Sequence, residues 1–288
     1  MSIASEFVSP SQPLPSAQAI EHWLSQAQTQ AQQPPAAARH KLWLHGQEIG
    51  SVTANFWQTL PAQALTQQRL DVQPLHDGWH LSALPGQARS ASQLLNTLAQ
   101  ILQDCGLCGP WRQEQLAVCN AQGQQVATIE RGAVRPLGIA TRAVHLVGVT
   151  EPGQLWVQQR AMSKPTNPGM WDTLMGGMVS AEDTIAEAVE RETWEEAGLR
   201  MGDLQHSRHG GFVEFSRPSD EAEGQGYMRE RIDWYAATVP AHLSPNNQDG
   251  EVQAFALLTP SQVQHAVLQQ RFTPEAALVL AGFFGWFK

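Results

Sequence analysis

The stretch GGMVSAEDTIAEAVERETWEEAGL, residues 176–199, decides the fold, and it is dense in carboxylates. Between residues 182 and 196 there are seven acidic residues and one basic residue, Arg191. The pattern predicts a helix from Thr184. Three carboxylates at spacing i, i+3 and i+4 would share one face of it: Glu192, Glu195 and Glu196. Like charges at this spacing repel each other. Either this face is simply solvated, or a hard divalent cation that prefers oxygen ligands, Mg²⁺ or Mn²⁺, relieves the repulsion between the carboxylates.

The spacing of the whole string favours the cation, because it resembles the Nudix box G-x5-E-x7-R-E-U-x-E-E-x-G-U, where U is apolar. Seven fixed positions match: Gly177, Arg191, Glu192, Glu195, Glu196, Gly198 and Leu199. Two positions depart from the pattern. Asp183 stands where the first glutamate is expected, directly after Glu182, and Thr193 stands at an apolar position.

The resemblance implies both a fold and a chemistry. The fold would be a Nudix α/β/α sandwich with a mixed sheet. The box helix would hold Mg²⁺ or Mn²⁺ while water attacks a diphosphate in line. The implied metal ligands and catalytic carboxylates are these: Glu192, Glu195 and Glu196, with Asp183 as a further ligand. Arg191 would orient the glutamates rather than contact substrate.

A finer resemblance covers most of residues 111–258. Residues 144–177 carry an R-x3-K and PGxWD pattern before the box. This pattern occurs in isopentenyl-diphosphate isomerase-like proteins and in a subgroup related to the Nudix half of thiamine pyrophosphokinases. Residues 246–257 also fit that subgroup, in which an N-terminal domain precedes the Nudix domain. The subgroup implies a damaged thiamine diphosphate as substrate.

Candidate substrate contacts lie before the box helix: Arg160, Lys164, Trp171, Gly176 and Gly177. The two cations would hold a diphosphate, or they are ordinary surface charge. The indole would stack on a heterocycle, or it packs in the core. The glycines allow close backbone approach. Outside the box, Glu251 is a candidate metal ligand or general base, and the alternative is a turn residue.

Composition narrows the class of protein. The formal net charge is −9, which argues against nucleic-acid binding because that needs a basic stripe. Residues 136–288 hold 19 acidic and 11 basic residues, whereas residues 1–135 hold 8 and 7. Neither a membrane-spanning run nor a secretory signal is expected. Three cysteines favour reduced thiols and a cytoplasmic protein. The expected partner is a small diphosphate substrate, and a homodimer is left open.

The pattern of predicted strands and helices changes near residue 135, and this change predicts two domains. Residues 1–135 predict a smaller α+β domain of unknown role, a substrate lid or a dimer surface. Residues 136–288 predict the Nudix domain, in which strands alternate with helices.

Two other functions remain as alternatives, a different pyrophosphatase and a sensor, while the sequence argues against an isomerase. A pyrophosphatase for nucleoside-diphosphate sugars or dinucleotides would use the same box. An isopentenyl-diphosphate isomerase needs a reactive cysteine on a strand, and no cysteine follows Cys119. A Nudix-fold sensor would bind its ligand without cleaving it, and loss of box glutamates would favour it. All three core glutamates are present.

Overall fold

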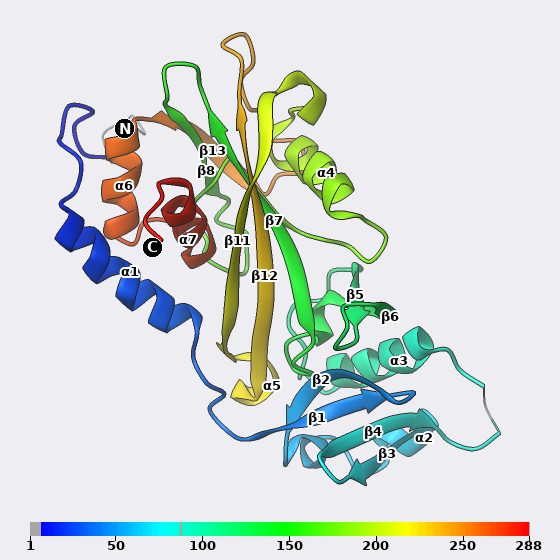
Figure 1. Cartoon of the computed structure of the whole chain (residues 1–288). Helices are drawn as coiled ribbons and strands as arrows, with labels where there is room; N and C mark the ends of the chain where they lie inside the picture. Colours follow the sequence, from blue (N-terminus) through cyan, green and yellow to red (C-terminus); the bar gives the residue numbers. More distant parts are fainter. Residues whose placement is uncertain (1–6, 87, 288) are drawn as a thin grey trace.

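The computed structural model describes residues 7–86 and 88–287. Figure 1 shows two sheet-containing parts, one built from the second half of the chain and one from residues that precede it. Residues 1–6, on which the expected lack of a secretory signal partly rests, lie outside the described residues. Within the described ranges, no helix has both the length and the apolar character needed to cross a bilayer.

The larger sheet has seven strands in a mixed arrangement. Their bounds are β7 (Ala140–Val149), β8 (Leu155–Arg160), β9 (Trp171–Asp172), β10 (Met175–Met178), β11 (Gln205–Ser219), β12 (Gly226–Thr238) and β13 (Val252–Leu258). The order is β11-β12-β7-β8-β13, with β10 on β7 and β9 on β8. The β12–β7 pair is parallel, while β11–β12, β7–β8 and β8–β13 are antiparallel.

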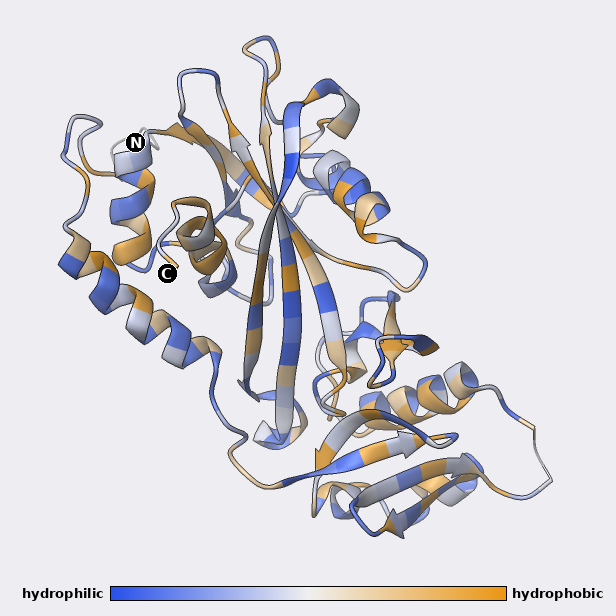
Figure 2. Cartoon of the chain, viewed as in Figure 1, coloured by the Kyte–Doolittle hydropathy of each residue, from blue (hydrophilic) through white to orange (hydrophobic). Residues whose placement is uncertain are grey.

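Helices cover both faces of this sheet. Helix α4 (Ile185–Ala197) packs on one face; α1 (Ala17–Ala31), α6 (Pro260–Leu268) and α7 (Pro274–Phe283) pack on the other (Figure 1). Strand β7 serves both layers, because its side chains alternate: Val144 belongs to the α4 cluster and Val147 to the α7 cluster. Bands of apolar and polar residues also alternate along the long strands (Figure 2). The expected α/β/α sandwich with a mixed sheet is confirmed.

The N-terminal part is a smaller α+β unit, as expected. Its sheet runs in the order β2-β1-β4-β3 and mixes parallel and antiparallel pairs. The strands are β1 (Arg39–Leu44), β2 (Gln47–Thr53), β3 (Leu70–Leu75) and β4 (Gly78–Ala83); the helices are α2 (Ala64–Gln67) and α3 (Ala91–Asp104). A hairpin of β5 (Gln115–Cys119) and β6 (Gln125–Glu130) follows. The short helical turns are η2 (Phe56–Thr59), η3 (Arg131–Ala133), η4 (Met201–Asp203) and α5 (Glu221–Gly224).

The first described residues pack on the sheet of the second half. Phe7 lies against Trp171 with ring centroids 5.1 Å apart, and Trp23 of α1 lies 5.6 Å from Trp286. The backbone N–H of Gln33 donates to the carbonyl of Ser216 at 2.8 Å. Residues 7–33 therefore help to build the second core, and the division of the chain at residue 135 stays a prediction.

Local signals at both ends explain why α4 begins and ends where it does. Thr184 caps the N-terminus: its hydroxyl accepts from the backbone of Glu187, whose carboxylate accepts in return from Thr184. At the other end Gly198 has a φ of 63°, in the left-handed region that glycine adopts without penalty. These two ends fix the length of the helix that carries the box glutamates.

We expect Gly198→Ala to destabilise the protein more than a matched glycine change. A Cβ at Gly198 would lie 2.5 Å from the carbonyl oxygen of Asn246, whereas one at Gly153, with a φ of 85°, would meet nothing within 4 Å. Gly153→Ala should cost about 1 kcal/mol, and Gly198→Ala roughly 1–3 kcal/mol more. Urea unfolding of both variants measures the difference, and equal losses would contradict the role given to the Gly198 turn.

Candidate active site

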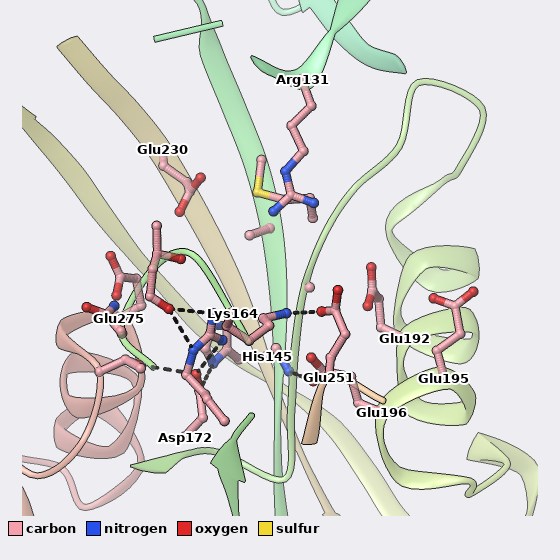
Figure 3. Close-up of a pocket in the computed structure, with 18 of the residues that line it drawn as sticks. Arg131, His145, Lys164, Asp172, Glu192, Glu195, Glu196, Glu230, Glu251 and Glu275 are labelled. Carbon is pink, nitrogen blue, oxygen red and sulfur yellow. Dashed lines mark hydrogen bonds and ion pairs between the residues drawn. The ribbon is translucent and has the colours of Figure 1, made fainter. Parts of the chain in front are cut away.

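A cleft of about 440 Å³ lies where the sheet, α4 and the N-terminal hairpin meet. Figure 3 shows Glu192, Glu195 and Glu196 projecting from α4 on one side, with Glu230 and Glu275 on the other. Most of the residues predicted for the site line it: Arg160, Lys164, Gly176, Gly177, Glu192, Glu195, Glu196 and Glu251. The fold thus brings together side chains that are up to 91 positions apart in the sequence.

The carboxylate of Glu196 is the most deeply buried of the three box glutamates. The residue is 2% exposed, and Oε2 accepts from the backbone N–H of Gly176 at 2.9 Å and from Nε2 of Gln158 at 2.7 Å. Burial raises its pKa to about 8, and the neighbouring charge of Glu192 adds to the rise. Without a cation nearby, Glu196 therefore holds its proton at neutral pH.

Glu192 is also held tightly against β10. A Cβ on Gly177 would overlap the Glu192 carboxyl group, so a larger residue here would displace that carboxylate. Burial raises the pKa of Glu192 to about 7, although Nη1 of Arg191 donates to its Oε1 at 2.8 Å. Glu195 is more exposed, and its Oε2 accepts from the same Nη1 at 3.0 Å. Two of the three carboxylates thus sit where their charge is costly.

Arg191 organises the outer side of this group, and Asp183 holds Arg191. Asp183 Oδ2 accepts from Nε at 2.9 Å and from Nη2 at 2.7 Å. Nη2 also donates to the carbonyl of Met178 at 3.1 Å. Asp183 itself is not among the residues that line the cleft. The shorter aspartate at this box position therefore reaches the arginine and not the cleft.

The two predicted phosphate-binding cations are already paired. Lys164 forms a short ion pair with Glu251, drawn as a dashed line in Figure 3. Burial lowers the pKa of Lys164. Arg160 donates to the carbonyl of Thr166 at 3.2 Å and lies 3.5 Å from Asp172. Substrate phosphates would compete for cations that carboxylates now hold.

The structure places Trp171 in the core and not on the cleft wall. The residue is 1% exposed and its ring packs edge-on against Phe7, so the indole is covered and offers no stacking surface. Its neighbour Asp172 faces the cleft instead and accepts from Thr273 at 3.3 Å. Period-two alternation along β9 explains why one residue points in and the next out. Buried His145 lies beside them, 2.9 Å from the hydroxyl of Thr173.

Sequence reasoning missed two further groups of cleft residues. One comes from the N-terminal hairpin and the turn after it: Glu114, Arg131 and Arg135. The other comes from β11, β12 and the start of α7: Arg217, Glu230 and Glu275. The first group falls within residues 111–258, which carry the finer resemblance, and that position was the one available signal. No motif spacing connects the second group to the box.

The donor set fits a hard divalent cation. Glu192 and Glu196 offer oxygen ligands whose pKa values are raised by burial, and the charges of Arg191 and Lys164 offset this rise only in part. Among the described residues, no group of three or more acidic, histidine or cysteine side chains is placed so that it could hold a metal ion. Mg²⁺ commonly takes one or two carboxylates and completes its shell with water and substrate phosphates, so an open set suits it.

Comparison with known proteins finds relatives of the second half of the chain. The family profile of the NUDIX domain matches residues 140–281. The chain is 30% identical over 160 residues to "Nudix hydrolase 24, chloroplastic" of Arabidopsis thaliana, covering 54% of this chain and 43% of that protein. It is 34% identical over 107 residues to an uncharacterised Nudix hydrolase of Pseudomonas aeruginosa, covering 37% of this chain and 62% of that one.

A solved structure from Deinococcus radiodurans is similar with a TM-score of 0.47 and 21% identity, covering 60% of this chain and all of that one. This chain spans less than two thirds of either named relative. The box, the sandwich and the profile match agree on one assignment: residues 140–281 form a NUDIX domain, and an additional N-terminal region precedes it.

Proposed function

We propose that this cleft hydrolyses a diphosphate linkage in a small molecule with the help of Mg²⁺ or Mn²⁺. The observation that carries the proposal is the buried pair Glu192 and Glu196, held against the glycines of β10 with Glu195 beside it. Burying two neighbouring carboxylates is unfavourable unless a cation joins them. Loss of box glutamates would favour a sensor, and all three of them line the cleft.

Each proposed residue has a distinct role. The metal ligands are Glu192, Glu195 and Glu196. Asp183 acts indirectly: it holds Arg191, whose guanidinium donates to the carboxylates of Glu192 and Glu195. When bound, the metal neutralises diphosphate charge and acidifies water. Arg160 and Lys164 bind phosphate oxygens, and the backbone of Gly176 and Gly177 allows their close approach. Glu251 is the proposed general base, because it lines the same cleft as the box glutamates but comes from outside the box.

A thiamine diphosphate derivative is the proposed substrate class. The resemblance of residues 144–177 and 246–257 to the thiamine pyrophosphokinase-related subgroup supports it. The charge of the cleft also supports it. Nine carboxylate side chains line the cleft against six cationic ones, and those of Glu230 and Glu275 lie across from α4 (Figure 3). A diphosphate joined to a positively charged ring suits such a cleft, with the ring at the acidic end and not on Trp171.

We expect the purified protein with Mg²⁺ to release phosphate or a monophosphate from a member of a diphosphate panel. The panel includes thiamine diphosphate and its oxidised derivatives, nucleoside-diphosphate sugars and dinucleotides. Glu196→Gln should lower kcat/KM by at least about 100-fold, since even groups that only orient metal ligands contribute about 10- to 100-fold. The measurement is product release under steady-state conditions for each compound.

Glu190→Gln is the matched control for that experiment. Glu190 lies on the same helix but outside the cleft, and its carboxylate accepts from the backbone of Met201 at 3.2 Å. This variant should keep wild-type turnover. Equal turnover by Glu196→Gln, or activity that survives removal of divalent ions by a chelator, would refute metal-centred hydrolysis at α4.

We also expect Mg²⁺ to stabilise the protein more at pH 8.5 than at pH 5.5. Because burial raises the pKa of Glu192 to about 7 and of Glu196 to about 8, the folded metal-free protein binds more protons than the unfolded chain between pH 4.5 and 8. Its stability should therefore fall as pH rises through that window. Mg²⁺ replaces these protons and removes the penalty.

The shift of the melting temperature on adding Mg²⁺, measured at both pH values, tests this linkage. At a concentration about 100-fold above Kd the gain is about 2.7 kcal/mol. In the double variant Glu192→Gln, Glu196→Gln, the shift of the melting temperature on adding Mg²⁺ should no longer depend on pH. An identical Mg²⁺ shift at both pH values in the wild type would contradict the expectation.

A further inference from the structure

The N-terminal region supplies one wall of the cleft. Glu114 precedes β5 and Arg131 begins η3, and both line the cleft that α4 borders. Figure 3 shows Arg131 entering from the side of the N-terminal hairpin, into the space between Glu230 and Glu192. The N-terminal region therefore contributes side chains to the cleft, which its sequence did not predict.

Backbone contacts fix the turn that carries Arg131. The N–H of Arg131 donates to the carbonyl of Glu114 at 2.9 Å. Gly109 donates to the carbonyl of Gly132 at 2.9 Å. The buried carboxylate of Glu130 accepts from the backbone of Arg112 at 2.7 Å. Because the base of the side chain is held in this way, its position in the cleft is largely set before any ligand arrives.

The same hairpin is joined directly to the loop before α4. The N–H of Ala181 donates to the carbonyl of Gln115 at 2.8 Å, and Leu116 forms a bridge with Ser180. These contacts lie just ahead of Thr184, where α4 is capped. The wall with Arg131 and the helix with the glutamates are therefore parts of one connected frame.

Arg131 is the most exposed cation in the cleft. Its side chain is 39% exposed, whereas those of Arg160 and Lys164 are 13% and 14% exposed. Its Nη1 donates to Oε2 of Glu114 at 2.7 Å. Within the described chain, Glu114 is the one side chain paired with this guanidinium, which leaves further N–H donors for a ligand.

Building on the proposed hydrolase function, we propose that Arg131 binds phosphate oxygens of the substrate opposite the carboxylates of α4, and that Glu114 is its positioning residue. A guanidinium offers a planar fork that matches phosphate oxygens in pairs. The excess of carboxylates in the cleft makes an added cation valuable for an anionic diphosphate. The N-terminal region is thereby a substrate-binding part and not only a cover.

Binding of methylenediphosphonate with Mg²⁺ tests the role of Arg131 without needing turnover, and kinetics with a panel substrate test the role of Glu114. By titration calorimetry, Arg131→Ala should weaken binding about 10- to 100-fold, the usual effect of losing hydrogen bonds to a charged group. The affinity of Arg131→Lys should lie between those of the wild type and Arg131→Ala, because lysine keeps the positive charge but not the planar pair of N–H donors. Glu114→Gln should raise KM for the best panel substrate more than it changes kcat.

Arg89→Ala is the matched control: it removes the same charge from the N-terminal region but at a residue outside the cleft, and it should bind like the wild type. Arg131→Lys decides the question if the alanine variant does not fold. Equal affinity of the wild type and the Arg131 variants, or no binding by the wild type, overturns the inference even if hydrolysis is observed. Weaker binding by these variants supports it even if no panel compound is hydrolysed.

Discussion

Two carboxylates buried side by side, those of Glu192 and Glu196, impose the main constraint on this structure. Their charge is unfavourable in a covered position, and so the groups around them either donate hydrogen bonds or leave room for a cation. Gly176 donates its N–H to Glu196, and Gly177 leaves the space that the Glu192 carboxyl group occupies. The glycine pair is thus a consequence of where the glutamates lie.

The same constraint explains the outer side of α4. Arg191 is shared among Asp183, Glu192 and Glu195, so one cation balances several anions and keeps their side chains in fixed rotamers. Glu196 is not part of that network and depends on Gln158 and Gly176 instead. The inner carboxylate is therefore the one whose charge is left for a metal to balance, while the outer ones are already partly neutralised.

Helix periodicity and box spacing were sufficient to predict α4 and the set of glutamates that share one of its faces, because these depend on neighbours in the sequence. Long-range placement was not available from such patterns. Trp171 packs on Phe7, 164 positions earlier, and no local signal predicts that contact. Asp183 pairs with Arg191 and does not line the cleft, and this depends on how the loop before α4 closes. The place of Arg131 in the cleft depends on the docking of β5 on residues 180–181. Sequence patterns do not predict such a contact between distant segments.

The packing of residues 7–33 has an evolutionary consequence. Phe7 lies on Trp171, one residue from Asp172 of the cleft, while Glu114 and Arg131, at the two ends of the β5–β6 hairpin, line another part of the cleft. The chain therefore crosses from one unit to the other and back. A recombination event with a breakpoint near residue 135 would separate parts of a single hydrophobic core from each other. Residues 136–288 on their own would lose the contacts that Phe7 and Trp23 make with that core.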